Sequence, residues 1–374
     1  MAEVPPDHDA WLTAELARLY TVEPTNNPGI LLGFPVWGAK FIERFAEFFL
    51  PSLLAPRNAE ALRAMNAKVV IYTTADDFIH LWRRAWPIEQ AGIRLEFGYF
   101  PKALTEGNEP GRKYRLLGTV QNALIQRAAR SGMGFHMAMP DIVYSERYFE
   151  ALAGLVGKHE AIANGCLSSN IETIRPEISQ HRNGNGLICV SAAALGDMSW
   201  RHLHKYMVAA VINGRETPAT TLNLLLWRGL GAVHVATPHL NPIWIGPELC
   251  RRAPVLAPTS LDAEIPNFMP DGFYIPEIGD DMGMVEISDD TKPVSPAGTM
   301  TNFINFCWQQ MNFDERYLDV MRRTTRVPIA LLLDGMTDAE IEQQHKALID
   351  QLAGQTMPAF AAYMTRNHRR MLRA

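Results

Sequence analysis

The spacing of apolar residues predicts strands that alternate with helices in the first half of the chain. Residues 68–74 are rich in β-branched side chains, and the apolar spacing of 78–86 then fits a helix. Residues 30–34 and 134–139 are two further apolar runs of strand length, and 114–130 has the spacing of a long helix. Repeated strand–helix units predict an α/β fold with a mainly parallel sheet flanked by helices.

One predicted helix of this half carries an aromatic stripe. It begins near Ala39 and places four phenylalanines on one face, namely Phe41, Phe45, Phe48 and Phe49. We expect this stripe to pack into the core.

The second half of the chain has weaker patterns. We expect helices over 199–211, 218–228 and 301–323, and a strand that begins near Gly231 and ends at Pro238. Residues 253–300 contain seven prolines and nine acids, which predicts an acidic loop region.

Composition and charge indicate an ordinary globular protein. Hydrophobic residues make up 47% of the chain and charged residues 20%, and the net charge of −5 gives no reason to expect nucleic acid as a partner. The four cysteines form no CxxC pair, which favours a reducing compartment over a disulfide framework or a zinc knuckle. The acidic, polar N-terminus does not resemble a signal peptide, and no apolar run approaches ~20 residues. We therefore expect a cytoplasmic protein.

Several common catalytic signatures are absent from the sequence. It contains no GxxxxGK[ST], no GxGxxG after a strand, no GxSxG and no HExxH. Their absence argues against a P-loop NTPase, a standard dinucleotide oxidoreductase, an α/β-hydrolase and a zincin.

Acidic residues follow two of the predicted strands. Asp76 and Asp77 come after 68–74, and Asp141 comes after 134–139 and Pro140. Ligands of open α/β sheets bind outside the carboxyl ends of the strands, so an acid there could hold a metal or a cation bound to phosphate. The alternative for Asp141 is structural, because Pro-Asp is a common turn pair.

Residues 68–77, 114–130 and 135–146 together resemble the GT-A fold of nucleotide-diphospho-sugar glycosyltransferases. In that family a strand ends in an Asp-x-Asp motif that binds a divalent metal on the nucleotide diphosphate. Here the first acid of the motif is replaced by Met139, and only Asp141 matches.

The resemblance covers about residues 28–250 and implies two regions. The first, 1–250, would be a Rossmann-like GT-A domain that binds a nucleotide sugar. The second, 251–374, would contain the acidic loop and a helical C-terminal appendage, whose last helix begins at a capping box of Thr337 and Glu340.

The resemblance also implies an activity: transfer of a sugar from a nucleotide-diphosphate donor to a carbohydrate, lipid-linked or small-molecule acceptor. Mg²⁺ or Mn²⁺ would bind to Asp141 and to His239, which follows Pro238. The remaining roles fall into three groups: ribose and base binding by Thr73, Thr74, Asp76 and Asp77; stabilisation of the departing diphosphate by Lys113 and Arg115; and a general base, Glu146 or Asp262.

Alternatives remain open at this point. Lys113 and Arg115 could be a solvated helix start, and Glu146 an acid favoured by a helix N-terminus. A sugar nucleotidyltransferase would need a basic loop after its first strand, and 33–38 contains no Lys or Arg. A non-catalytic relative that binds a carbohydrate or a protein would fit the missing acid at Met139. The basic C-terminal tail could contact a membrane surface, and a homo-oligomer is possible.

Overall fold

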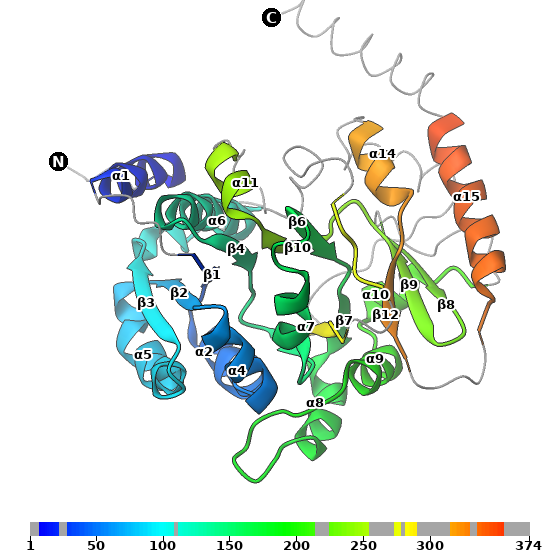
Figure 1. The fold of residues 1–374 in the computed structure, drawn as a ribbon, viewed down its shortest axis with the longest axis horizontal. Coiled ribbons are helices and arrows are strands. Elements are labelled where there is room, and N and C mark those ends of the chain that lie inside the picture. The colour runs from blue at the N-terminus through cyan, green and yellow to red at the C-terminus, as the bar shows by residue number, and fades with distance from the viewer. Residues whose placement is uncertain are drawn as a thin grey trace, which may run out of the picture.

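The computed structural model describes residues 7–21, 28–107, 111–213, 224–253, 273–277, 281–289, 315–329 and 335–354 (Figure 1). Within these residues the chain is an α/β protein whose mainly parallel central sheet is flanked by helices, as the sequence predicts. No helix in this described part is both long and apolar enough to cross a bilayer.

The central sheet has six strands in the order β3-β2-β1-β4-β10-β6. Their bounds are β1 Ile30–Pro35, β2 Lys68–Thr73, β3 Arg94–Tyr99, β4 Gly134–Met137, β6 Ala161–Asn164 and β10 Asn241–Ile245. The first four strands in that order are parallel, whereas β10 runs antiparallel to both of its neighbours. The carboxyl ends of β1, β2 and β4 therefore lie along one edge of the sheet.

Helices cover both faces of this sheet, so a central strand such as β1 is buried on both sides. Figure 1 shows α1 (His8–Tyr20), α6 (Arg112–Ser131) and α11 (Pro247–Arg252) on one face. The other face is covered by α2 (Ala39–Arg44), α4 (Pro56–Ala64), α5 (Ala75–Gln90) and α7 (Tyr148–Leu155). Alternate residues of β1 enter the two cores, with Leu31 on the α6 side and Leu32 on the α2 side.

Helix α2 does not end at Arg44 but continues through a π-helical turn, η1 (Phe45–Phe49), into α3 (Leu50–Leu53). Phe45, Phe48 and Phe49 are fully buried, so the predicted aromatic stripe is core at these three positions. Phe41 lies one turn earlier and is only partly buried.

Two three-stranded sheets complete the described fold. The second sheet has the order β5-β11-β7, with β5 at Ile142–Tyr144, β7 at Leu167–Asn170 and β11 at Met284–Ser288. The third sheet is antiparallel and has the order β12-β9-β8, with β8 at Leu225–Arg228, β9 at Ala232–Ala236 and β12 at Thr325–Pro328.

A short 3₁₀ turn, η2 (Lys102–Leu104), follows β3. The remaining described helices pack around the second and third sheets. They are α8 Ile171–Gln180, α9 Ala192–Arg201, α10 Lys205–Ala210, α14 Glu315–Met321 and α15 Asp338–Gly354. Helix α15 begins after the predicted capping box, in which Thr337 and Glu340 exchange hydrogen bonds.

The structure corrects three predictions in the second half of the chain. Residues 225–228 form a strand rather than the end of a helix, and 284–288 form a strand inside the predicted loop. The strand at 284–288 pairs with strands more than 100 residues earlier, which local spacing does not reveal, whereas the strand at 225–228 pairs with β9, the next strand along the chain. The helix predicted over 199–211 is divided between α9 and α10.

Two other predictions concern the helix over 301–323 and the division of the chain at residue 250. The described part of 301–323 is helical over Glu315–Met321, and 301–314 lies outside the described residues. Strands β11 and β12 come from beyond residue 250 but pair with strands that precede it. The division of the chain at residue 250 stays a prediction.

Candidate active site

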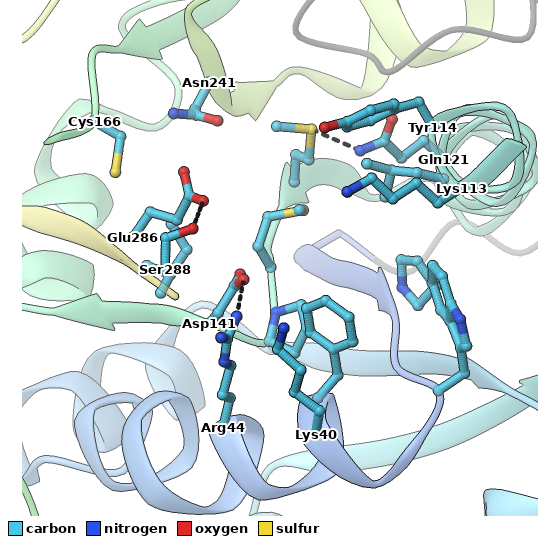
Figure 2. Close-up of a pocket in the computed structure, with 18 of the residues that line it drawn as sticks. Lys40, Arg44, Lys113, Tyr114, Gln121, Asp141, Cys166, Asn241, Glu286 and Ser288 are labelled. Carbon is cyan, nitrogen blue, oxygen red and sulfur yellow. Dashed lines mark hydrogen bonds and ion pairs between the residues drawn. The ribbon is translucent and has the colours of Figure 1, made fainter. Parts of the chain in front are cut away.

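A cavity of about 300 Å³ opens at the carboxyl ends of β1 and β4 (Figure 2). Its walls come from the segment after β1, from α2, from the start of α6, from the loop after β4 and from β10 and β11. The cavity therefore lies at the edge of the central sheet where the sequence predicts a ligand site.

Asp141 lies in the short segment that joins the central sheet to the second sheet. Strand β4 ends at Met137 and β5 begins at Ile142, so Asp141 is the last residue before the chain enters the second sheet. Its side chain is buried, and its backbone carbonyl accepts a hydrogen bond from the Ile287 N–H at 2.7 Å. Asp141 and Met139 both line the cavity.

Arg44 forms an ion pair with Asp141 in the cavity wall. Its Nη2 donates to Asp289 Oδ2 at 2.8 Å, and its Nη1 lies 3.7 Å from Asp141 Oδ2. Lys40, one helical turn earlier on α2, also forms an ion pair with Asp289. The guanidinium is buried, whereas the Lys40 side chain is about half exposed. Two acids from different parts of the chain are thus joined through one arginine.

Glu286 and Ser288 reach the cavity from β11. They are two residues apart on one strand, so their side chains share a face, and Ser288 Oγ donates to Glu286 Oε1 at 3.2 Å. Figure 2 shows Glu286 between Asp141 and Asn241. We did not single out Glu286 from the sequence. The alternation of apolar Val285 and Ile287 with these polar residues was the available signal.

The first turn of α6 supplies the wall across the cavity from Glu286. Lys113 and Tyr114 are exposed there, and the Lys113 ammonium lies 4.8 Å from the centre of the Tyr114 ring. Lys113 thus lines the cavity, whereas Arg115 does not. Arg115 and Arg112 are close enough to His8 of α1 to lower its pKa, although burial is the larger cause.

The polar residues at the end of β2 organise the backbone around the cavity without lining it. Thr73 is buried, and Thr74 caps α5 by accepting from the Asp77 N–H at 3.2 Å. Asp77 Oδ2 accepts from the Gly38 N–H at 3.0 Å and from Thr74 Oγ1 at 2.8 Å. Gly38 is the N-cap of α2, so Asp77 ties the helix that carries Lys40 and Arg44 to the start of α5.

Of the four other predicted site residues, three do not line the cavity and one is not described. Asp76 forms an exposed ion pair with Lys102. Glu146 follows β5, and its N–H donates to the Val190 carbonyl. His239 precedes β10, and its N–H donates to Thr237 Oγ1 at 3.1 Å. Asp262 lies outside the described residues. The roles of these residues stay predictions.

The predicted metal ligands do not form a ready-made site. His239 is not among the residues that line the cavity with Asp141. In the described part of the chain, no group of three or more His, Cys, Asp or Glu side chains could hold a metal ion. The donor set present therefore does not fit the predicted Mg²⁺ or Mn²⁺, and the proposal below contains no step through a metal.

A buried aromatic cluster supports the loop that carries Asp141. His136 on β4 lies 3.3 Å from the Tyr148 hydroxyl and packs against Tyr144 and Phe149. Burial lowers the pKa of His136 to about 3 and raises the pKa of Tyr144 and of Tyr148 well above the usual value. All three rings are therefore neutral at physiological pH.

Comparisons with known proteins complete the description. No protein-family model matches the sequence, and no curated protein matches it. Solved structures that are similar include a mannosyltransferase from Pyrobaculum calidifontis in complex with GDP-Man and Mn²⁺, at 14% identity and a TM-score of 0.36, covering 96% of this chain and 84% of that one.

Two structures of TarS from S. aureus are also similar. Residues 1–349 of TarS match at 9% identity and a TM-score of 0.29, over 87% of this chain and 65% of that one. A second TarS structure matches at 11% identity and a TM-score of 0.28, over 79% and 38%.

Proposed function

We propose that this protein is a glycosyltransferase that moves a sugar from a nucleotide-diphosphate donor to an acceptor hydroxyl. The observation that carries the proposal is the cavity at the carboxyl ends of β1 and β4, which brings Asp141 together with Lys40, Arg44 and Lys113. The resemblance of 135–146 to the GT-A strand-and-acid motif supports it. The volume of about 300 Å³ is at the lower end of the range for small-molecule sites.

The transfer needs cations that stabilise the leaving diphosphate and a base that accepts a proton, and the cavity has residues of both kinds. The acceptor oxygen attacks the anomeric carbon, and the bond from that carbon to the diphosphate breaks, so the diphosphate departs with the electron pair. Lys40 and Lys113 stabilise the growing negative charge. In a transfer that inverts the anomeric centre a general base accepts the proton of the acceptor hydroxyl, and we propose Glu286 for this role because it lines the cavity across from Lys113.

Nucleotide binding tests the proposal directly. Calorimetry with UDP, GDP and CMP, each with and without Mn²⁺, is expected to show that at least one of them binds. Lys113→Ala should weaken that binding by about 10- to 150-fold, because it removes a charge-assisted contact worth roughly 1.5–3 kcal/mol. Arg115→Ala is the matched control at the same helix start but outside the cavity, and it should change affinity less than twofold. Failure of every nucleotide to bind would reject the proposal.

Donor hydrolysis separates an enzyme from a binding protein of the same fold. The wild type should release nucleotide diphosphate slowly from its donor even without an acceptor. Glu286→Gln should keep nucleotide affinity but lower transfer by at least about 100-fold, since general-base catalysis contributes roughly 10²–10⁴ in rate. A wild type that binds a sugar nucleotide yet neither hydrolyses nor transfers it would be a non-catalytic carbohydrate-binding relative.

A further inference from the structure

We propose that the Arg44 guanidinium occupies the place of the divalent cation at Asp141, so that this cavity binds a nucleotide diphosphate without a metal ion. The inference rests on the proposed function for its ligand. It concerns the acid motif, in which Met139 replaces the first acid and only Asp141 matches the family that the chain resembles.

The geometry of Arg44 is that of a cation shared by two carboxylates. Its two terminal nitrogens point to different acids, one 2.8 Å from Asp289 Oδ2 and the other 3.7 Å from Asp141 Oδ2. Figure 2 shows Arg44 reaching up from α2 to Asp141 at the cavity wall. The motif that the chain resembles uses two acids and a metal, whereas this site has one of those acids, a second acid from the end of β11 and an arginine between them.

A metal ion at Asp141 would have to compete with this guanidinium. An arginine side chain stays protonated at any physiological pH, so its charge cannot be removed to admit a second cation. Moving Arg44 aside would leave a buried positive charge without its partners, which is costly. The Asp141 carboxylate is therefore a poor metal ligand for as long as Arg44 holds its place.

Several contacts hold Arg44 in that place. The guanidinium lies 5.5 Å from the centre of the Phe41 ring. Its helix is fixed at the N-terminus by the hydrogen bond from Gly38 to Asp77 and at the C-terminus by the buried phenylalanines of η1. Only 7% of the Arg44 side chain is exposed.

The two lysines of the cavity can then bind the diphosphate. Lys40 is 53% exposed and shares Asp289 with Arg44, so it can turn to an anion while Arg44 keeps Asp289 paired. Lys113 faces it from the start of α6. The charges of the described lining residues balance without a metal, with Lys40, Arg44 and Lys113 against Asp141, Glu286 and Asp289.

Titration with Mn²⁺ alone, followed by the paramagnetic resonance signal of free Mn²⁺, tests the first half of the proposal without any nucleotide. We expect the wild type not to bind Mn²⁺ at this site. Arg44→Gln should gain at least tenfold in Mn²⁺ affinity, and adding Asp141→Asn should abolish the gain. Arg44→Lys keeps the charge and should not gain, and Arg83→Gln on the exposed face of α5 is the control.

Two results would overturn this half. One is Mn²⁺ binding by the wild type that Asp141→Asn removes, and the other is an Arg44→Gln protein that folds but gains no Mn²⁺ affinity. Thermal melting establishes whether each variant folds. If Arg44→Gln does not fold, the comparison of wild type with Asp141→Asn still decides the question.

Calorimetry with UDP and GDP tests the second half. The wild type should bind its nucleotide with affinities that agree within threefold in EDTA and in 1 mM Mn²⁺. Binding that is more than tenfold tighter with Mn²⁺ would refute the inference but leave the proposed function intact. Absence of nucleotide binding under both conditions would reject the proposed function, and the Mn²⁺ titration would still test the position of Arg44.

Discussion

Individual residues of this protein carry charge or lose it according to what surrounds them. Arg44 and Asp141 are buried as an ion pair, whereas His136, five residues before Asp141 on β4, is buried among aromatic rings. Burial without a countercharge favours the neutral imidazole. This difference makes His136 a measurable source of acid sensitivity.

Replacing His136 by Leu should flatten the pH dependence of stability. The pKa of His136 is about 3 in the folded protein, compared with 6.5 as the ordinary value, so below pH 6.5 the unfolded chain takes up a proton that the folded protein does not. The wild type therefore loses stability as the pH falls, by about 2 kcal/mol from this residue between pH 7.5 and 5.

Urea denaturation of both proteins at pH 7.5 and pH 5 measures this difference. The variant also loses the contact of His136 with the Tyr148 hydroxyl, but this loss is the same at both pH values, so the difference between them isolates the titration of the imidazole. Equal losses of unfolding free energy in the two proteins would show that His136 is protonated in the folded state.

Single elements decide where the cavity residues point. Helix α2 begins at Gly38, which has a φ of 75°, and its position depends on the side chain of Asp77 in a different helix. Asp77 was predicted as a nucleotide ligand, which stays a prediction; in the structure its carboxylate accepts hydrogen bonds from Thr74, the N-cap of α5, and from Gly38, the N-cap of α2. Through Gly38, Asp77 also helps to position α2, which carries Lys40 and Arg44.

Asp77→Ala should destabilise the protein and disturb α2 together. Loss of the hydrogen bonds from Gly38 and Thr74 is expected to lower the unfolding free energy by about 1–2 kcal/mol. The neighbouring Asp76→Ala removes only an exposed ion pair with Lys102 and should have little effect. Chemical denaturation measures both, and equal effects would argue against the anchoring role of Asp77.

The elements also show what the sequence could and could not reveal. Strand β2 and helix α6 were predicted because their own residues carry the pattern of a buried strand and an amphipathic helix. Strand β11 was missed because it is stabilised by β5 and β7, which lie more than 100 residues earlier. Asp141 and Lys113 were found from strand and helix ends, whereas Arg44 and Glu286 depend on packing that only the fold creates.

On the scale of the whole molecule, α9 joins the second and third sheets. It packs against β7 and β11 of the second sheet and against β9 and β12 of the third. Gly196 in this helix lies so close to β12 that an added Cβ would be 1.9 Å from the Pro328 carbonyl oxygen. The contact is with backbone, which cannot rotate away.

Gly196→Ala should therefore weaken the packing of α9 between the two sheets and destabilise the protein. Overpacking of this kind is expected to cost about 1–3 kcal/mol in unfolding free energy. Gly154 in α7 is the matched control, because an added Cβ there meets nothing within 4 Å. Gly154→Ala should be neutral or stabilise the protein by up to about 1 kcal/mol. Thermal melting compares the two, and a Gly196→Ala protein as stable as the wild type would contradict the assigned contact.

The π-helical turn after Arg44 makes the site depend on the length of the chain as well as on its chemistry. A π turn amounts to an α-helix with one residue inserted, and such turns often occur at functional sites. Removing one residue from Phe45–Phe49 would restore a regular helix and rotate everything before it by about 100° relative to everything after it. Lys40 and Arg44 would then leave the cavity if the phenylalanines kept the core, or the phenylalanines would leave the core. A related sequence with a one-residue gap here would align well on both sides and still lack this site.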